Sequence, residues 1–268
     1  GKIGRVSYRF IKTSHIPGGY SILLEYPEAK TILYSGDVRL SKTQLMREKK
    51  DFPKADVLFT DCTYAGDTHP DRGDTEKEFE RIILRTLRKC GKVVIPCFSV
   101  ARTQEILLVL AKIGEKINVP IYLDGMMGKE ITRIYLRYAE ALDNKNLLRG
   151  IKNVIPIEDH HERMEALDKT GIIVTSGGMV NSPLAQFYVQ SISQDRNSAV
   201  ILPGFVAEET GGYEMKTKGT LTIDDQTFKL KCAIYQLNFS AHADSVEIKE
   251  LVKIVDPEVV IAMHGEEA

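Results

Sequence analysis

Residues 92–110 read KVVIPCFSVARTQEILLVL, and their pattern changes part-way along. The first seven residues, 92–98, are mostly apolar and β-branched, which is typical of a buried strand, and the remainder predicts a helix that begins near Ser99. A buried strand followed directly by a helix is the repeating unit of sheets with parallel strands. This stretch therefore predicts an α/β protein.

The same alternation continues on both sides of residues 92–110. A strand at 55–61 precedes an amphipathic helix at 74–90, with its acids early and its bases late, as the helix dipole favours. Two apolar runs at 20–26 and 31–36 are separated by turn residues and predict a hairpin. Segment 206–230, rich in Gly, Thr and Lys, is predicted as an exposed β-excursion. The remaining predicted strands are 119–125, 171–178, 198–204 and 257–265, and the remaining predicted helices are 127–141, 182–192 and 245–255.

The composition sets limits on the class of protein. Of the 268 residues, 43% are hydrophobic and 27% are charged, which fits a soluble globular protein of one or two domains. No apolar run approaches the roughly 20 residues of a membrane helix, so no membrane partner is predicted. The four cysteines lack CxxC spacing, and we expect reduced thiols in a cytoplasmic protein. The net charge of −1 neither favours nor excludes nucleic acid.

Four polar residues stand where predicted strands begin or end. His15 precedes a strand in TSHIPGG, Asp37 follows one in YSGDVRL, His242 follows one in NFSAHADS, and His264 follows one in VVIAMHG. Loops at strand ends converge on one edge of an α/β sheet, so these side chains form a candidate site. Taken singly, each histidine also fits a surface residue, and Asp37 fits a turn residue.

The other histidines and a nearby acid have simpler interpretations. His69, His160 and His161 lie in polar or charged stretches and are predicted to be solvated. The sequence from Asp244 to Glu247 matches a capping box that opens the helix at 245–255.

In order, these stretches resemble the motifs of the β-CASP family of metallo-β-lactamase-fold nucleases, of the RNase J and cleavage and polyadenylation specificity factor type. SHIPGGYSILLE, with His15, and YSGDVRL, with Asp37, are similar to the third and fourth metal motifs. LFTDCTYA, with Asp61, is similar to motif A of the family. FSAHADS, with His242, and VIAMHGEE, with His264, are similar to motifs B and C. The resemblance covers essentially the whole chain.

The resemblance implies a metallo-β-lactamase αββα sandwich, incomplete at its N-terminus, that carries an inserted α/β β-CASP domain. The implied limits are 1–64 and 232–268 for the metallo-β-lactamase domain and 65–231 for the insert. The implied activity is zinc-dependent hydrolysis of RNA phosphodiester bonds, in RNA processing or decay. The nucleophile would be a hydroxide shared by two zinc ions.

The resemblance also implies a role for each residue. His15 and His264 would be zinc ligands, with Asp37 as the carboxylate between the two ions. His242 would be catalytic and lie near the scissile phosphate, with Asp61 as the acid that orients it.

One family motif, HxHxDH, is absent, and no HxH occurs anywhere in the chain. The expectation is therefore a fragment that cannot hold two zinc ions or cut RNA by itself. Two other functions stay open: a DNA nuclease of the same superfamily, and a non-catalytic RNA-binding subunit of an RNA-processing complex. His264 favours RNA over DNA, since the DNA-repair branch typically has Val in motif C. The sequence leaves open endonucleolytic or exonucleolytic cleavage, and assembly as a homodimer or within a complex.

Two strand-turn-helix junctions in the predicted insert are suited to a phosphate of RNA. One carries Ser99 and Arg102, and the other is the turn of Ser176, Gly177 and Gly178. Ser99 also fits a simple N-cap, and the glycines fit a simple tight turn. The residues Lys129, Arg133 and Arg137 recur every fourth position and predict a basic helix face that is either solvated or part of a nucleic-acid groove.

Overall fold

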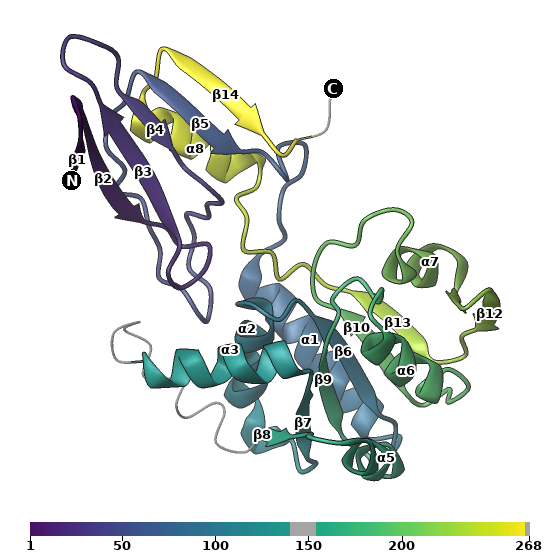
Figure 1. The fold of residues 1–268 in the computed structure, drawn as a ribbon. Coiled ribbons are helices and arrows are strands. Elements are labelled where there is room, and N and C mark those ends of the chain that lie inside the picture. Colours follow the sequence, from purple (N-terminus) through teal and green to yellow (C-terminus); the bar gives the residue numbers. More distant parts are fainter. Residues whose placement is uncertain (140–153, 266–268) are drawn as a thin grey trace. The chain divides into compact units, whose positions relative to one another are not determined.

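The computed structural model describes residues 1–139 and 154–265, which form two compact units (Figure 1). Unit 1 comprises Gly1–Pro70 and Ser240–Ala268, and unit 2 is the intervening segment Asp71–Phe239. The chain thus leaves unit 1 once, builds unit 2 and returns.

The borders of the units lie a few residues beyond the predicted limits after 64 and 231. Residues beyond Tyr64 stay with unit 1 because the backbone of Asp67 accepts a 2.9 Å hydrogen bond from the N–H of Ser245. At the return, β13 (Ala233–Gln236) pairs in parallel with β10 (Ala199–Leu202) and therefore belongs to the sheet of unit 2. Sequence alone did not show which sheet this strand would join.

Unit 1 contains a six-stranded sheet in the order β1-β2-β3-β4-β5-β14. Neighbours from β1 to β4 are antiparallel, whereas β4, β5 and β14 run parallel to one another. The predicted hairpin is confirmed as β3 and β4. The strands are β1 (Lys2–Ile3), β2 (Val6–Lys12), β3 (Tyr20–Glu25), β4 (Ile32–Tyr34), β5 (Val57–Asp61) and β14 (Val259–Met263).

One face of this sheet packs against helix α8 (Ser245–Val255), as Figure 1 shows for β5 and β14. The alternation of side chains along the strands places Leu33 and Leu58 on this face, where they share a buried cluster with Leu251. On the opposite face, aromatic residues such as Phe10 and Tyr34 remain exposed.

Helix α8 begins as predicted, but its capping differs from the predicted box. The carboxylate of Asp244 accepts hydrogen bonds from the N–H groups of Val246 and Glu247, at 3.0 and 2.9 Å. Glu247 does not complete the reciprocal box. Its carboxylate instead accepts hydrogen bonds from the N–H groups of Leu40 and Ser41, so it ties the first turn of α8 to the segment that follows Asp37.

Unit 2 is built on a parallel six-stranded sheet in the order β13-β10-β6-β9-β7-β8, with helices on both faces. Every residue of β6 is buried, as expected for a strand covered on both sides. A buried cluster joins α1 and α2 to one face, and a second joins α5, α6 and α7 to the other. The strands are β6 (Val93–Cys97), β7 (Ile121–Asp124), β8 (Val154–Pro156), β9 (Ile172–Ser176), β10 and β13. The helices are α1 (Arg72–Leu87), α2 (Arg102–Lys112), α3 (Met126–Arg137), α5 (His160–Asp168), α6 (Pro183–Ile192) and α7 (Gly211–Lys218), with a 3₁₀ turn at Gly114–Lys116.

Two predicted elements of unit 2 differ from the structure. Helix α2 begins at Arg102 rather than near Ser99, because Ala101 has a φ of +60° that a right-handed helix cannot include. The predicted β-excursion at 206–230 was wrong in its first half, which contains α7, and is correct only for the hairpin β11 (Thr220–Ile223) and β12 (Gln226–Lys229). The helix predicted at 127–141 ends at Arg137, and residues 140–141 lie outside the described residues.

All four cysteines are free thiols, as predicted: Cys62, Cys97 and Cys232 are buried and Cys90 is exposed. In the described ranges, 1–139 and 154–265, no helix combines the length and apolar character that crossing a membrane requires.

Candidate active site

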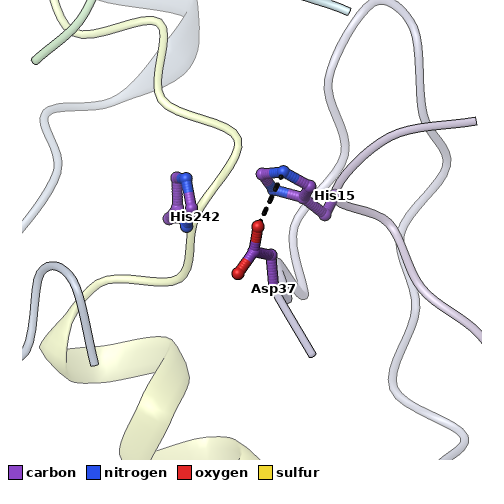
Figure 2. A group of neighbouring side chains, drawn as sticks. All are labelled: His15, Asp37 and His242. Atoms are coloured by element: carbon purple, nitrogen blue, oxygen red, sulfur yellow. Dashed lines mark ion pairs between the residues drawn. The ribbon is translucent and has the colours of Figure 1, made fainter. Parts of the chain in front are cut away.

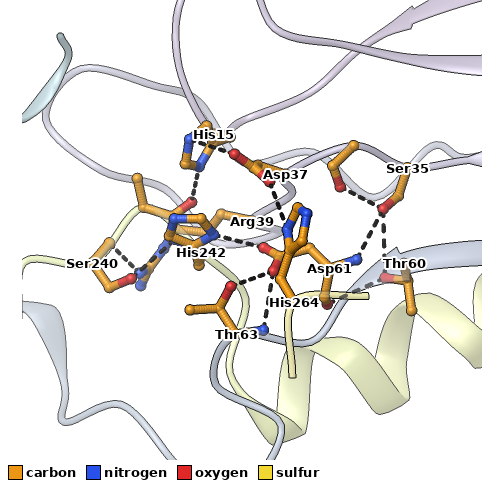
Figure 3. Close-up of polar contacts among 12 residues, drawn as sticks. His15, Ser35, Asp37, Arg39, Thr60, Asp61, Thr63, Ser240, His242 and His264 are labelled. Carbon is orange, nitrogen blue, oxygen red and sulfur yellow. Dashed lines mark hydrogen bonds and ion pairs between the residues drawn. The ribbon is translucent and has the colours of Figure 1, made fainter. Parts of the chain in front are cut away.

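The topology of unit 1 explains why residues far apart in sequence meet. Because β4, β5 and β14 are parallel, their carboxyl ends share one edge of the sheet, where Asp37 follows β4, Asp61 ends β5 and His264 follows β14. Strand β3 is antiparallel to β4, so its start lies beside the end of β4 and brings the His15 loop to this edge. The loop before α8 adds His242 (Figure 3).

His15 has its two ring nitrogens in different environments. Its Nδ1 lies 2.9 Å from the carbonyl oxygen of Ala241, which can only accept, so Nδ1 carries the hydrogen. The Nε2 lone pair is left to face Asp37, with 3.5 Å between Nε2 and Oδ2 (Figure 2). Burial lowers the pKa of His15, and the nearby His242 lowers it further. A neutral imidazole whose second nitrogen is fixed by a carbonyl is the form in which histidine binds metals.

Asp37 lies between two histidines and presents a different oxygen to each. Oδ2 faces Nε2 of His15, and Oδ1 lies 3.7 Å from Nδ1 of His264. The side chains of Asp37 and His264 are 40% and 60% exposed, so both are open to solvent. This arrangement suits a carboxylate shared by two cations.

His264 adopts an unusual backbone conformation, with a φ of +60°. A residue other than glycine rarely occupies this left-handed region, and such residues are common at functional sites. The preceding residue, Met263, is still paired with Asp61 across β14 and β5. The turn at His264 thus occurs immediately beyond the sheet.

Asp61 and His242 form a hydrogen-bonded pair. Oδ2 of Asp61 lies 2.6 Å from Nδ1 of His242, and Oδ1 accepts hydrogen bonds from the N–H and hydroxyl of Thr63 at 3.0 and 2.6 Å. Burial alone would raise the pKa of Asp61, whose side chain is 1% exposed, but the hydrogen bonds from His242 and Thr63 lower the pKa to about 2. Asp61 is therefore ionised at neutral pH and orients the His242 ring.

Among the described residues, two groups of three have ligand atoms within 4.8 Å of one another: His15, Asp37 and His242, and Asp37, Asp61 and His264. Asp37 belongs to both groups, as a shared carboxylate would. Imidazole nitrogens and carboxylate oxygens are ligands that zinc accepts, so the donor set fits this ion. Each group also includes one member of the predicted catalytic pair, which sequence reasoning had kept apart from the metal ligands.

Comparison with known proteins gives two family matches along the chain. The Beta-Casp domain family matches residues 103–215, and the family of the Zn-dependent metallo-hydrolase RNA specificity domain matches residues 227–268. The chain belongs to the β-CASP family of metallo-β-lactamase-fold nucleases. The predicted fold class is thereby confirmed: a metallo-β-lactamase fold with a β-CASP insert.

Three relatives illustrate the range of the β-CASP family around this chain. Probable RNase MJ4 of Methanocaldococcus jannaschii is 36% identical, over 97% of this chain and 62% of the relative. RNase aCSPSF2 of Saccharolobus solfataricus is 33% identical, over 98% of this chain and 53% of the relative. Cleavage and polyadenylation specificity factor 73 of Drosophila melanogaster is 28% identical, over 94% of this chain and 39% of the relative. The chain thus spans about three fifths of the first relative and about half of the second.

In unit 2, which contains the Beta-Casp match, the predicted phosphate-binding residues lie at the carboxyl edge of the sheet. Ser99 follows β6 and its hydroxyl donates to that of Ser176, at the end of β9, over 3.2 Å. Gly177 has a φ of +104°, and a Cβ there would lie 2.1 Å from the hydroxyl oxygen of Ser182. A Cβ on Gly178 would lie 2.9 Å from the backbone nitrogen of Phe98, so both glycines are required for this close packing.

The predicted cations of unit 2 are engaged with the protein itself. The guanidinium of Arg102 donates to the carbonyl of Pro203 over 2.6 Å. On α3, Lys129 donates to the carboxylate of Glu158 over 2.5 Å, and Arg133 lies 3.5 Å from the same side chain. Glu158 therefore offsets part of the positive charge of the helix face formed by Lys129, Arg133 and Arg137.

Sequence reasoning missed residues that support the site. His160 and His161 are exposed as predicted, but His69 is half-buried and its Nε2 lies 3.0 Å from the carbonyl oxygen of His242. The buried Arg39 donates from Nη1 to the carbonyl of Ser240 over 2.5 Å. The position of Arg39 two residues after Asp37 was the only sequence signal for it, and His69 gave none.

Proposed function

We propose that the protein is a zinc-dependent ribonuclease that hydrolyses RNA phosphodiester bonds. The observation that carries the proposal is the position of Asp37, whose two oxygens face two different histidines beside the hydrogen-bonded pair of Asp61 and His242. The names of the relatives, two of which are RNases, support RNA as the substrate.

In this proposal, His15, His264 and Asp37 would hold the zinc. Zinc, when bound, supplies Lewis-acid activation of water and of a phosphoryl oxygen. The hydrogen bond from Nδ1 of His15 to Ala241 keeps its Nε2 available as a ligand. The exposure of Asp37 and His264 leaves this edge accessible to a nucleic-acid strand.

Asp61 and His242 then act as the acid-base pair rather than as ligands. Both oxygens of Asp61 accept hydrogen bonds, from His242 and Thr63, so this carboxylate is already satisfied without a metal. The carboxylate of Asp61 accepts the hydrogen of Nδ1 of His242, which leaves Nε2 as the nitrogen available for proton transfer. His242 can then deliver a proton from Nε2 to the ribose oxygen that leaves when the phosphodiester bond breaks.

The carboxyl edge of unit 2 is proposed to bind a phosphate of the RNA. Ser99 and Ser176 supply hydroxyl groups there, and the tight Gly177–Gly178 turn supplies the backbone N–H of Gly178, since that of Gly177 donates to the carbonyl of Cys97 over 3.0 Å. We place the protein in the cytoplasm, because its four free cysteines suit a reducing compartment. It would act as a homodimer or within an RNA-processing complex, the latter by analogy with the Drosophila relative.

Two substitutions in the full-length protein separate the proposed roles. His264→Val removes a ligand, so zinc content and RNA cleavage should fall together. His242→Ala should retain zinc and RNA binding while cleavage falls by about 10²–10⁴-fold, the range for a lost general acid or base. His161→Ala, at an exposed position on α5, is the matched control and should change neither quantity.

Zinc is measured by mass spectrometry of the dialysed protein, and cleavage by gel analysis of labelled RNA. Full activity and full zinc content in His264→Val would refute the ligand assignment. Zinc loss in His242→Ala equal to that in His264→Val would make His242 a ligand.

Residues 1–268 produced alone provide a second test. If Asp61 and His242 are not ligands, each ion keeps one histidine and a share of Asp37, below the three protein ligands of a catalytic zinc site. We therefore expect this segment to bind RNA in a salt-dependent way but to lose zinc on dialysis and to leave RNA intact. Retention of two zinc ions would instead show that the two groups of three hold the metal without further ligands.

A further inference from the structure

The loop that carries His242 is held on one side by residues of the site itself. The guanidinium of Arg39 donates to the carbonyl of Ser240 over 2.5 Å, and the N–H of Ala243 donates to the carbonyl of Val38 over 2.6 Å. Nδ1 of His15 binds the carbonyl of the intervening residue, Ala241. These contacts all come from segments next to the proposed zinc ligands.

The other side of the loop is held by His69, which no motif includes. Its Nε2 lies 3.0 Å from the carbonyl oxygen of His242, and its backbone N–H donates to Oδ2 of Asp244 over 2.7 Å. A carbonyl oxygen only accepts, so Nε2 of His69 must carry the hydrogen. Burial lowers the pKa of His69 and favours its neutral form at neutral pH, in which a single ring nitrogen donates.

The His69 ring is itself fixed by packing. The ring of the buried Tyr64 meets it edge-on, with 4.7 Å between centroids, and the same tyrosine lies 6.3 Å from the His242 ring. Tyr64 also forms a β-bridge with Asp244. His69 is therefore wedged between Tyr64 and the backbone of residues 242–244, with little freedom to turn away.

We propose that His69 is a positioning residue for His242. By binding the main-chain carbonyl of His242, it fixes the direction in which the imidazole leaves the backbone, so that Nδ1 stays on Asp61. Nε2 is then the ring nitrogen that is not bonded to Asp61, and the ring keeps its place in the group that His242 forms with His15 and Asp37. His69 acts only through His242, and the inference rests on the proposed role of His242 in RNA cleavage.

The expected size of the effect follows from the geometry. Loss of one backbone hydrogen bond would let the His242 peptide shift, and misplacement of a reacting group by about 1 Å can cost about 10²-fold in rate. We expect His69→Leu to lower kcat by about 10–100-fold, with KM and zinc content unchanged. His69→Gln, whose amide N–H can donate from a similar position, should restore most of the rate.

The test is a double-mutant cycle with His242→Ala in the full-length protein, with His160→Leu as an exposed control. Because His69 acts through His242, His69→Leu should cause no further loss in the His242→Ala background. An additive loss would overturn the proposal. The proposal would also be overturned if the lower cleavage rate of His69→Leu were explained by a lower zinc content or by a smaller folded fraction. A cleavage rate in His69→Gln as low as that in His69→Leu would overturn it too.

A second readout does not depend on catalysis. The hydrogen on Nδ1 of His242, shared with Asp61, should give a downfield proton signal in ¹⁵N-histidine-labelled protein, broadened or shifted by His69→Leu and retained in His69→Gln. If His242→Ala leaves cleavage intact but His69→Leu still perturbs this signal, the proposed function fails and the positioning of His242 stands. If His242→Ala abolishes cleavage but His69→Leu changes neither rate nor signal, the positioning proposal fails alone.

Discussion

The carboxyl edges of the two sheets both carry a buried aspartate at the end of a parallel strand, yet the two acids have different hydrogen-bond partners. Asp124, at the end of β7, receives hydrogen bonds from Arg163 at 2.6 and 3.3 Å and from the hydroxyl of Tyr188 at 2.7 Å. Asp61, at the end of β5, receives them from His242 and Thr63. The charge of Asp124 is thus matched by a permanent cation, whereas the partner of Asp61 is a histidine, the other member of the proposed catalytic pair.

Asp124 thus has the partners of a structural acid, whereas Asp61 is the acid proposed to orient His242. The bond to Asp124 raises the pKa of Arg163, and burial together with Asp124 raises the pKa of Tyr188, so neither partner changes its charge near neutral pH. At the edge of unit 1, Asp37 and Asp61 meet histidines, and Asp37 remains 40% exposed. The negative charge of this edge can therefore bind cations from solution. Burial of a carboxylate alone does not indicate function, but the type of its partner does.

The largest expected effect comes from Asp37→Asn, which removes the shared charge of the unit 1 edge. Zinc content should fall below one ion per chain, and RNA cleavage by the full-length protein should fall by about 10³-fold or more. Loss of metal removes several kcal/mol of charge stabilisation, and each 1.4 kcal/mol is a factor of ten. Asp124→Asn is the control and should leave the zinc content unchanged. Equal zinc loss in both variants would erase the distinction between the two edges.

A smaller effect, on stability, is expected from Asp124→Ala. The substitution leaves Arg163 and the buried hydroxyl of Tyr188 without their acceptor and should lower the free energy of unfolding of unit 2 by about 3 kcal/mol. Hydrogen exchange followed by mass spectrometry reports each unit separately. As a control, Glu115→Ala at an exposed position should change the free energy of unfolding of unit 2 by less than about 0.5 kcal/mol. An effect of Asp124→Ala no larger than that of the control would contradict a structural role.

The smallest expected effect is on how the free energy of unfolding of unit 1 depends on pH when no metal is bound. The pKa of Asp61 is about 2 when folded, below the roughly 3.9 of an unfolded chain. Ionised Asp61 thus contributes about 2 kcal/mol above pH 4, and this contribution is lost as pH falls toward 2. Asp61→Asn should therefore destabilise unit 1 at pH 7 but hardly at pH 2.5, whereas the exposed Asp225→Asn should have little effect at either pH. A constant difference between Asp61→Asn and the native protein at all pH values would show that charge is not the cause.

Much of the fold was readable from local patterns. The strand at 92–98 and the helix at 245–255 appear as β6 and α8, because buried β-branched runs and a capped amphipathic helix are strong local signals. Helix α7 was missed although Thr210 caps it and Gly219 ends it with a φ of +66°. Two glycines in its first turn and a high content of turn residues masked these signals.

The site was predictable as a set of residue types but not as a set of contacts. The motif resemblance implied that Asp61 orients His242, but the other contacts of the site follow only from the parallel pairing of β4, β5 and β14, which brings the loops of this edge together. His69 was predicted to be solvated because its partner is a backbone carbonyl far along the chain, which no sequence pattern records. The pairing of Lys129 with Glu158 was invisible for the same reason.

The contact between the two ends of unit 2 has a consequence for how the chain folds. The guanidinium of Arg72 lies 4.6 Å from the centroid of the Phe239 ring, and Phe79 packs edge-on against the same ring, so both ends of the unit leave from one place. Closing so long a disordered loop would cost on the order of 4–5 kcal/mol of entropy in its logarithmic part alone. Once unit 2 has folded, its two ends already lie close together, and β14 can pair in parallel with β5 after only the short returning segment that contains α8. We therefore expect the Asp61 and His264 edge to be completed last during folding, as a fast step that waits for the inserted unit.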